Sequence, residues 1–363
     1  MPQSEGLSRP RQTDWRALMD NILRKGTPRR VHHIELYHDP EVRNAIADRF
    51  GLMKGVSPDD PHYEHRKLIA VNRFCGFDIA QSGLVGTGLS YNWLKTEDAA
   101  GLKRQAGRKF MDEHAGPITN WAQFETYPWP DVRSPQATRD LEWLQGELPD
   151  DMCISCQTGH FAENLCWLMG YETLCYSLYD QPDLVEAIFE KVKEIHAAEL
   201  ELILQFDRVR IIWGSDDMGH KTGLLISPQD MRRLVLPGHK MLAEMAHRAG
   251  RIYMLHSCGN LTDIIDDLIH DVKLDAKHSF EDTIEDVRDA KRTYGRHMAL
   301  LGWIDMDFLC RADQAAVRRR VRDTLGVCMP GGGYCLGTGN TAANYVPLDN
   351  YLAMVDEGML YAG

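Results

Sequence analysis

The sequence contains no apolar run of about eighteen residues, the length that a membrane-spanning helix needs. Its first residues, MPQSEGLSRPRQTDW, are polar and lack the apolar segment of a secretory signal peptide. The nine cysteines are odd in number and scattered along the chain, which indicates a reducing compartment rather than a disulfide framework. We therefore expect a cytoplasmic protein that has no membrane partner.

Acidic residues outnumber basic ones, 53 to 41, and the formal net charge is −12. The densest basic run, RRRVR at 318–322, is flanked by Asp313 and Asp323 on a predicted helix. That pattern is typical of a solvated helix face rather than of a nucleic-acid contact. We expect no nucleic-acid partner.

Several motifs that would assign a function are missing. No G-x-G-x-x-G follows an early predicted strand, and the glycine-rich stretch GTGNTAAN at 337–344 lacks the lysine of a phosphate-binding loop. No G-x-S-x-G nucleophile turn is present. These absences disfavour dinucleotide-binding, P-loop and serine-hydrolase functions.

What the 363 residues do contain is an alternation of short apolar runs and helical patterns. Helical spacing occurs at 181–206, 227–250, 260–272, 283–295 and 311–325. Eight candidate strands lie at 30–37, 78–85, 152–158, 208–214, 251–257, 274–280, 298–304 and 332–339. Such alternation predicts a parallel sheet, and eight strands predict a (β/α)8 TIM barrel, with a doubly wound open sheet as the rival.

The predicted organisation is a single barrel domain over 30–363, preceded by an N-terminal extension over 1–29. The segment 86–150 is rich in tryptophan and proline. We expect it to form a lid of loops and helices over one face of the barrel.

The chemistry of a (β/α)8 barrel lies at the carboxyl ends of its strands, so the polar residues expected there are candidates for function. They are Glu35, Tyr37, His160, Glu163, Asp216, Asp217, His256, Cys258, His278, Glu281, Asp305 and Cys335. From these positions we assign catalytic roles to Asp217, Asp216, His160 and Asp305.

His256 and Cys258 are two residues apart, which on a strand points both side chains to the same face. A barrel would bring the last strand, which carries Cys335, to the same mouth. Two thiolates and an imidazole are ligands that zinc prefers, and three protein ligands leave a position open for catalysis. We predict zinc on His256, Cys258 and Cys335, with Asp217 or Asp216 as a weak further ligand. Ordinary core packing of a histidine and two buried cysteines is the alternative.

Four stretches, LLISPQDMRRLVLPGHKML, MLHSCGNLTDIIDDLI, LGWID and GGGYCLGTGNTAANYVPLDNYLAMVDEGMLYA, resemble the uroporphyrinogen decarboxylase superfamily. Within it, HSCGN and YCLG look like the zinc- and cobamide-dependent methyltransferase branch. The resemblance covers roughly residues 30–361 and is strongest after residue 208. It implies the same barrel, zinc at His256, Cys258 and Cys335, and an acidic residue near the zinc at Asp217 or Asp216.

The resemblance implies transfer of a methyl group between a small substrate, such as a methyl ether, thioether or thiol, and a corrinoid. This chain shows no corrinoid-binding segment, so the corrinoid is expected on a partner protein docked over the mouth. Tyr37, Trp213, Trp93 and His160 are expected to line that mouth.

Which half-reaction is catalysed stays open. The length of 86–150 favours a substrate:corrinoid methyltransferase over a corrinoid:thiol one. A uroporphyrinogen decarboxylase-like activity is a weaker alternative, because the stretch RRVHHIELYHDPEV lacks the arginine pattern that grips porphyrin carboxylates. A non-catalytic zinc- or ligand-binding barrel is a further alternative, and a homodimer is left open.

Overall fold

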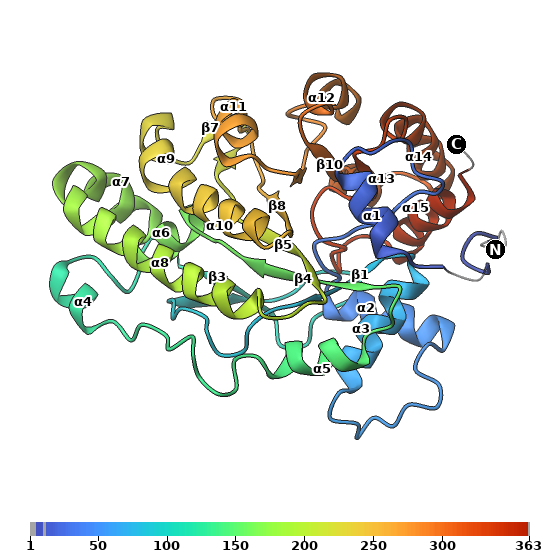
Figure 1. Cartoon of the computed structure of the whole chain (residues 1–363), viewed down its shortest axis with the longest axis horizontal. Coiled ribbons are helices and arrows are strands. Elements are labelled where there is room, and N and C mark those ends of the chain that lie inside the picture. Colours follow the sequence, from blue (N-terminus) through green and yellow to red (C-terminus); the bar gives the residue numbers. More distant parts are fainter. Residues whose placement is uncertain (1–4, 10–11, 113, 362–363) are drawn as a thin grey trace.

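A computed structural model describes residues 5–9, 12–112 and 114–361 of the chain. Residues 1–4 and 10–11 of the predicted extension, residue 113 of the segment 86–150 and residues 362–363 at the end of the predicted barrel domain lie outside the described residues. The centre is a curled sheet of seven parallel strands in the order β1-β4-β5-β8-β9-β10-β11, covered by helices (Figure 1). Its strands are β1 (Ile79–Ser82), β4 (Cys153–Thr158), β5 (Val209–Ser215), β8 (Ile252–His256), β9 (Ala276–His278), β10 (Ala299–Ile304) and β11 (Tyr334–Thr338).

The seven strands coincide with seven of the eight predicted runs, which confirms a mixed α/β fold with a parallel sheet. The prediction of an eighth regular strand over 30–37 is wrong. In that segment only His33 forms isolated parallel bridges, one to Phe77 beside β1 and one to Leu336 of β11. Further along, the side chain of Gln81 donates to the backbone oxygen of Glu35 at 3.0 Å, where a regular ladder would need a backbone donor.

The helices of the described residues lie along and around this sheet. They are α1 (Trp15–Ile22), α2 (Pro40–Phe50), α3 (Tyr63–Phe74), α4 (Trp121–Thr126), α5 (Arg139–Glu147), α6 (Ala162–Met169), α7 (Tyr171–Asp180), α8 (Pro182–Ile203), α9 (Pro228–Leu234), α10 (Leu236–Arg248), α11 (Ile265–Asp267) with a π-helical turn (Leu268–Val272), α12 (Val287–Tyr294), α13 (Met306–Arg311), α14 (Gln314–Cys328) and α15 (Leu348–Leu360). None has both the length and the apolar character that a membrane crossing requires.

One expected helix is split in two. The pattern at 227–250 begins as predicted at Ser227, whose hydroxyl accepts the amide of Asp230 at 3.1 Å. The helix breaks at Val235 and resumes as α10, with Pro237 in its first turn. Proline has no amide hydrogen and its ring collides with the carbonyl four residues earlier, so it is tolerated only in a first turn.

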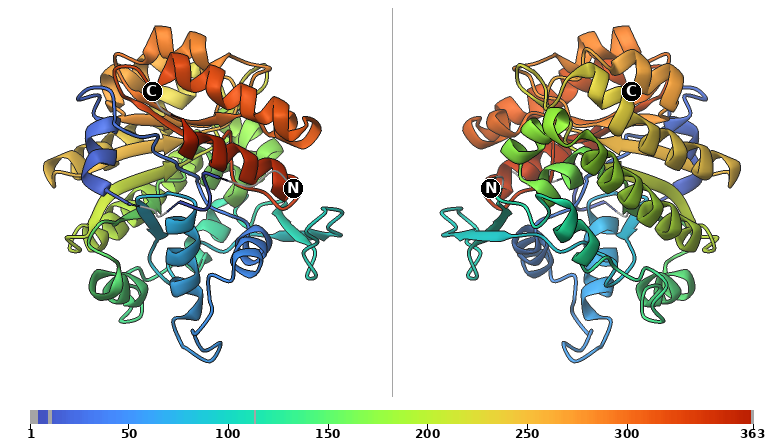
Figure 2. Two further views of the ribbon diagram at one scale, coloured as in Figure 1. Left: turned by 90° about the vertical axis from the view of Figure 1, so that its right-hand side faces the viewer. Right: turned by 90° about the vertical axis from the view of Figure 1, so that its left-hand side faces the viewer.

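The segment 86–150 contains more than the predicted loops and helices. Besides α4 and α5 it forms an antiparallel hairpin of β2 (Trp93–Thr96) and β3 (Arg108–Met111), which projects from the body in Figure 2. A second small hairpin pairs β6 (Gly219–His220) with β7 (Gly223–Leu224). The guanidinium of Arg104, in the β2–β3 connection, contacts Glu41 at 3.0 Å and Asp39 at 3.3 Å. These ion pairs tie the hairpin to the residues that follow the first predicted run.

Part of the predicted N-terminal extension packs against the sheet. Asp14 donates its amide to Asp78 at 2.7 Å, and the side-chain amide of Asn21 in α1 donates to the carbonyl of Tyr334 at 2.8 Å. Asp78 precedes β1 and Tyr334 begins β11, so α1 covers the amino ends of the strands. The opposite, carboxyl ends are left for the candidate site.

Glu35 is a fully buried carboxyl group that accepts the amide of Thr338 at 2.9 Å and also the Thr338 hydroxyl. Burial raises the pKa of Glu35 to about 8, although both Thr338 bonds act to lower it. The folded protein therefore keeps a proton here that the unfolded chain releases above its ordinary pKa of about 4.3.

We expect Glu35→Gln to stabilise the protein at pH 8 but not at pH 4. The folded-state pKa is raised, so wild-type stability falls as the pH rises from about 4 to about 8, by roughly 3 kcal/mol at pH 7. Glutamine is neutral throughout and removes this dependence. Thermal unfolding of both proteins from pH 4 to 9 checks this, and parallel curves would contradict it.

Candidate metal centre

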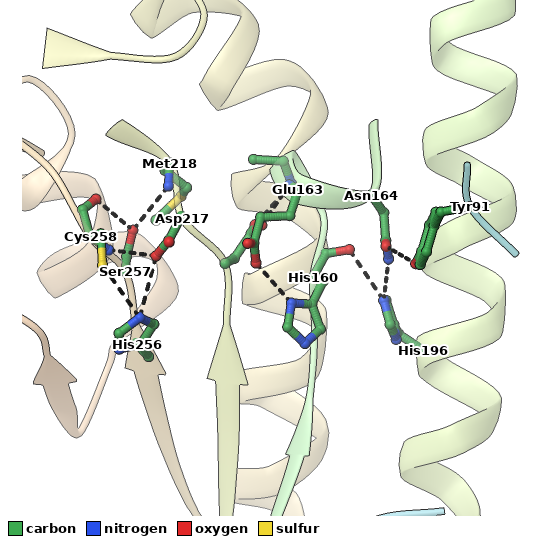
Figure 3. A network of polar contacts seen from close by, with 12 residues as sticks. Tyr91, His160, Glu163, Asn164, His196, Asp217, Met218, His256, Ser257 and Cys258 are labelled. Atoms are coloured by element: carbon green, nitrogen blue, oxygen red, sulfur yellow. Dashed lines mark hydrogen bonds and ion pairs between the residues drawn. The ribbon is translucent and has the colours of Figure 1, made fainter. Parts of the chain in front are cut away.

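The ends of β5 and β8 bring together three side chains of types that can bind a metal ion. Ser215 lies opposite His256 in the parallel ladder, so Asp217 and Cys258 each follow the pairing by two residues. One ligand atom each from Asp217, His256 and Cys258 lies within 4.8 Å of the other two (Figure 3). Among the described residues, no other group of three or more histidine, cysteine, aspartate or glutamate side chains brings its ligand atoms within that distance of one another.

The spacing of the three ligand atoms suits a tetrahedral zinc ion. His256 Nε2 lies 3.3 Å from Asp217 Oδ1 and 3.5 Å from Cys258 Sγ. Zinc bonds of about 2.0–2.3 Å at tetrahedral angles place their ligands roughly 3.4–3.6 Å apart. The side chains therefore need little rearrangement to hold zinc, and three protein ligands leave one position for a substrate.

The charges of the site also favour a cation. Burial raises the pKa of Asp217, but the hydrogen bond and charge of His256, with the amide of Cys258, outweigh it and bring the pKa to about 2. Burial raises the pKa of the Cys258 thiol well above its usual range. A bound zinc ion would reverse that shift, because a coordinating thiol loses its proton.

A second layer of polar groups surrounds the ligands. Cys258 Sγ lies 3.3 Å from both the Ser279 hydroxyl and Asn340 Nδ2, and His256 Nδ1 lies 2.7 Å from His278 Nδ1. Ser279 has a φ of 77°, a strained conformation for a residue with a side chain. Hydrogen bonds of this kind fix ligand orientation in metal sites. His278 was expected at a strand end from the sequence, whereas no sequence pattern pointed to Ser279 or Asn340.

Close packing of two loops explains why position 259, in the SCGN stretch, is a glycine. Gly259 has a φ of 83°, and a Cβ atom there would lie 2.2 Å from the carbonyl carbon of Gly219. Asn260 donates its amide to the carbonyl of His220 at 2.8 Å. The loops that carry Asp217 and Cys258 thus touch through their backbones, and a side chain at position 259 would separate them.

Cys335 does not belong to this group, contrary to its predicted convergence with His256 and Cys258. It is the second residue of β11 and is fully buried, and its sulfur accepts the side-chain amide of Asn21 at 3.4 Å. Asn21 covers the amino ends of the strands, whereas the metal ligands lie at the carboxyl ends. Asn340, five residues further along, contacts Cys258 instead.

Asp216 is turned away from the metal ligands. It is fully buried, and its carboxylate accepts the amides of Ala162 and Glu163 at 2.9 Å each and contacts His239 Nε2 at 2.9 Å. It therefore holds the first turn of α6, and of the two adjacent acids only Asp217 faces the metal group.

Two further assignments also differ from expectation. Asp305 caps α13 through the amide of Phe308 at 2.9 Å and accepts the amide of Asp282 at 3.1 Å, so both of its oxygens have structural partners. Trp213 is fully buried in β5, with its ring centroid 5.4 Å from that of His278 in an edge-to-face arrangement. It does not line the mouth, because no macrocycle reaches a side chain enclosed in the core.

The remaining candidates lie on the carboxyl side of the sheet. Tyr37 is 46% exposed and Trp93 is 52% exposed. Burial raises the pKa of Tyr37, and so do the charges of Asp39, Glu163 and Asp217, while Arg104 lowers it. His160 is hydrogen-bonded through Nδ1 to Glu163 at 2.9 Å.

Comparisons with known proteins agree with this architecture. The family model described as uroporphyrinogen decarboxylase (URO-D) matches residues 99–358. No curated protein sequence matches the chain significantly. A solved methyltransferase from Methanosarcina mazei is similar over 94% of this chain and 97% of its own, with a TM-score of 0.70 and 16% identity, which establishes a shared fold. A B12-independent methionine synthase from Shewanella sp. W3-18-1, in complex with selenomethionine, covers 80% of this chain and 83% of its own at a TM-score of 0.48 and 11% identity, too distant to support an argument.

Proposed function

Because this chain belongs to the uroporphyrinogen decarboxylase family, we propose that it is a zinc-dependent methyltransferase that moves a methyl group between a small substrate and a corrinoid carried by a partner protein. The observation that carries the proposal is the group formed by Asp217, His256 and Cys258. The fold shared with a solved methyltransferase supports it.

The proposed zinc would be held by Asp217, His256 and Cys258. When bound, zinc acts as a Lewis acid that polarises a heteroatom carrying a methyl group or lowers the pKa of a thiol. The chain's own residues prepare the site. Ser279 and Asn340 orient the Cys258 sulfur, and His278 fixes the ring of His256 through Nδ1. Exposed Tyr37 and Trp93 offer aromatic surface for a planar cofactor.

The charges near this site argue against a decarboxylase of polycarboxylate substrates. Such a substrate needs unpaired cations, but two arginines of the 86–150 segment are already engaged by acids. Arg104 is paired with Asp39 and Glu41, and Arg108 contacts Asp98 at 3.2 Å. The metal group adds a further carboxylate at Asp217. We therefore favour a small substrate over a porphyrinogen.

The proposal is tested with purified protein. We expect about one zinc per chain. We also expect transfer of a methyl group from a methyl ether to the reduced corrinoid of a carrier protein, and the change in corrinoid absorbance measures this transfer. Removal of the metal with a chelator is expected to abolish transfer, and zinc is expected to restore it. A metal-free protein that decarboxylates a porphyrinogen would overturn the proposal.

A further inference from the structure

A histidine and a carboxylate form a pair just beyond the end of β4, the strand next to β5, which leads to the metal centre. His160 follows β4 and Glu163 lies in the first turn of α6, with His160 Nδ1 2.9 Å from Glu163 Oε2. β4 pairs with β5, Thr158 lying opposite Gly214. The strands that lead to His160 and Asp217 are therefore neighbours, about 4.8 Å apart where they pair. Figure 3 shows the pair beyond the strand that leads to Asp217.

The pair is held rigidly from behind. The backbone amide of Glu163 donates to Asp216 Oδ1 at 2.9 Å, and Asp216 is itself fixed by His239. The backbone oxygen of His160 lies 3.3 Å from His196 Nε2, which in turn lies 3.1 Å from the side-chain amide of Asn164. The His160 side chain remains 31% exposed. With Nδ1 engaged by Glu163, Nε2 is the ring nitrogen left to meet a substrate.

Negative groups surround this pair on several elements. Burial lowers the pKa of His160, but the hydrogen bond and charge of Glu163, with Asp216 and Glu199, raise it above its usual value. Burial raises the pKa of Glu163 to about 7; His160 acts to lower it, while Asp216 and Asp217 add to the rise. The negative charge of Glu163 also raises the pKa of Tyr37. Together these groups keep a proton on the pair near neutral pH.

We propose that the His160–Glu163 pair is the acid that protonates an oxygen leaving group, so that the substrate class is methyl ethers. This inference rests on the proposed methyltransferase function. In the step, the carbon–oxygen bond breaks and its electron pair stays on oxygen, while the methyl carbon bonds to the nucleophile, a reduced corrinoid on the partner. The oxygen takes a proton from His160 Nε2, which water later replaces.

Two other kinds of substrate, a quaternary ammonium donor and a thiol acceptor, do not need this acid. A quaternary ammonium ion releases a neutral amine, which needs no proton at the moment of departure. A thiol acceptor must lose a proton, so it needs a base rather than an acid. An alkoxide or phenolate is the leaving group whose departure a positioned acid accelerates, by about 10²–10⁴-fold.

The test uses His160→Asn and Glu163→Gln with aryl methyl ethers whose phenols differ in pKa. For poor leaving groups we expect His160→Asn to lower kcat about 10²- to 10³-fold. For nitrophenyl ethers, which need no protonation, the rates are expected to stay near wild type. The wild-type kcat for a poor leaving group is expected to fall at alkaline pH, and His160→Asn is expected to lose that fall. Glu163→Gln is expected to show a smaller loss with the same dependence on leaving group.

His247→Asn is the matched control, because His247 pairs with Asp275 at 2.8 Å on the amino-end side of the sheet. Zinc content and thermal unfolding confirm that each variant is folded. Equal loss of kcat over all ethers would show a merely structural role and overturn the inference. Wild-type activity with quaternary ammonium donors but not ethers would overturn the substrate class alone. Absence of zinc and of all methyl transfer would overturn the proposed function and this inference with it.

Discussion

Cys258→Ala is expected to yield a folded protein that retains almost no zinc, while Cys335→Ala is expected to bind zinc like wild type. The Cys258 sulfur lies 3.5 Å from the His256 ligand nitrogen, whereas Cys335 contacts Asn21 at the opposite ends of the strands. Substitutions among residues that only orient ligands cost about 10–100-fold in metal affinity, so loss of a ligand is expected to cost more than 100-fold.

Elemental analysis and competition with a zinc-binding dye measure this difference. Asn340→Ala, which removes only a donor to the Cys258 sulfur, is expected to weaken zinc binding without abolishing it. Loss of zinc in Cys335→Ala with an intact fold would return the site to the predicted His256, Cys258 and Cys335 set. Full occupancy in Cys258→Ala would exclude Cys258 as a ligand and contradict both sets.

Substitution of two adjacent aspartates is expected to have opposite consequences. Asp216→Ala leaves a fully buried His239 and two amides of α6 without their acceptor, and each buried donor left without a partner costs about 1–3 kcal/mol. Asp217→Ala removes a 41% exposed side chain and is expected to cost less stability than Asp216→Ala while weakening zinc binding.

Urea unfolding of the metal-free proteins measures the first effect, and zinc titration measures the second. Asp216→Asn keeps one acceptor oxygen and is expected to lie between wild type and Asp216→Ala. Equal stability losses at the two positions would contradict the assignment of one acid to structure and the other to the metal.

The strands and helices, which follow from periodic apolar residues, were predictable from the sequence. Which side chains reach the carboxyl edge of the sheet was not, because that depends on where each strand ends. Apolar runs located seven strands, and Ser227 marked a helix start correctly. The run around Cys335 was recognised as a strand, but whether a cysteine reaches the mouth depends on its distance from the carboxyl end. Cys335 is three residues short of the end at Thr338, and Asn340 lies beyond it.

The two aspartates illustrate a second limit. Asp216 and Asp217 are neighbours in sequence, and their roles differ only because α6 and His239 meet one of them while His256 and Cys258 meet the other. Those partners come from segments tens of residues away. The sequence pattern limited the carboxylate expected near the metal to two positions, and only the packing distinguished them.

The backbone contact between Gly259 and Gly219 has a consequence for protein engineering. The Asp217 loop and the Cys258 loop touch where no side chain fits, so their separation is set by main-chain thickness rather than by adjustable side chains. Grafting the HSCGN stretch alone onto another parallel α/β scaffold would supply a thiol and an imidazole without the carboxylate at its 3.3 Å spacing. The transplantable unit is both loops together, 215–224 and 256–260, with each glycine kept and neither loop lengthened.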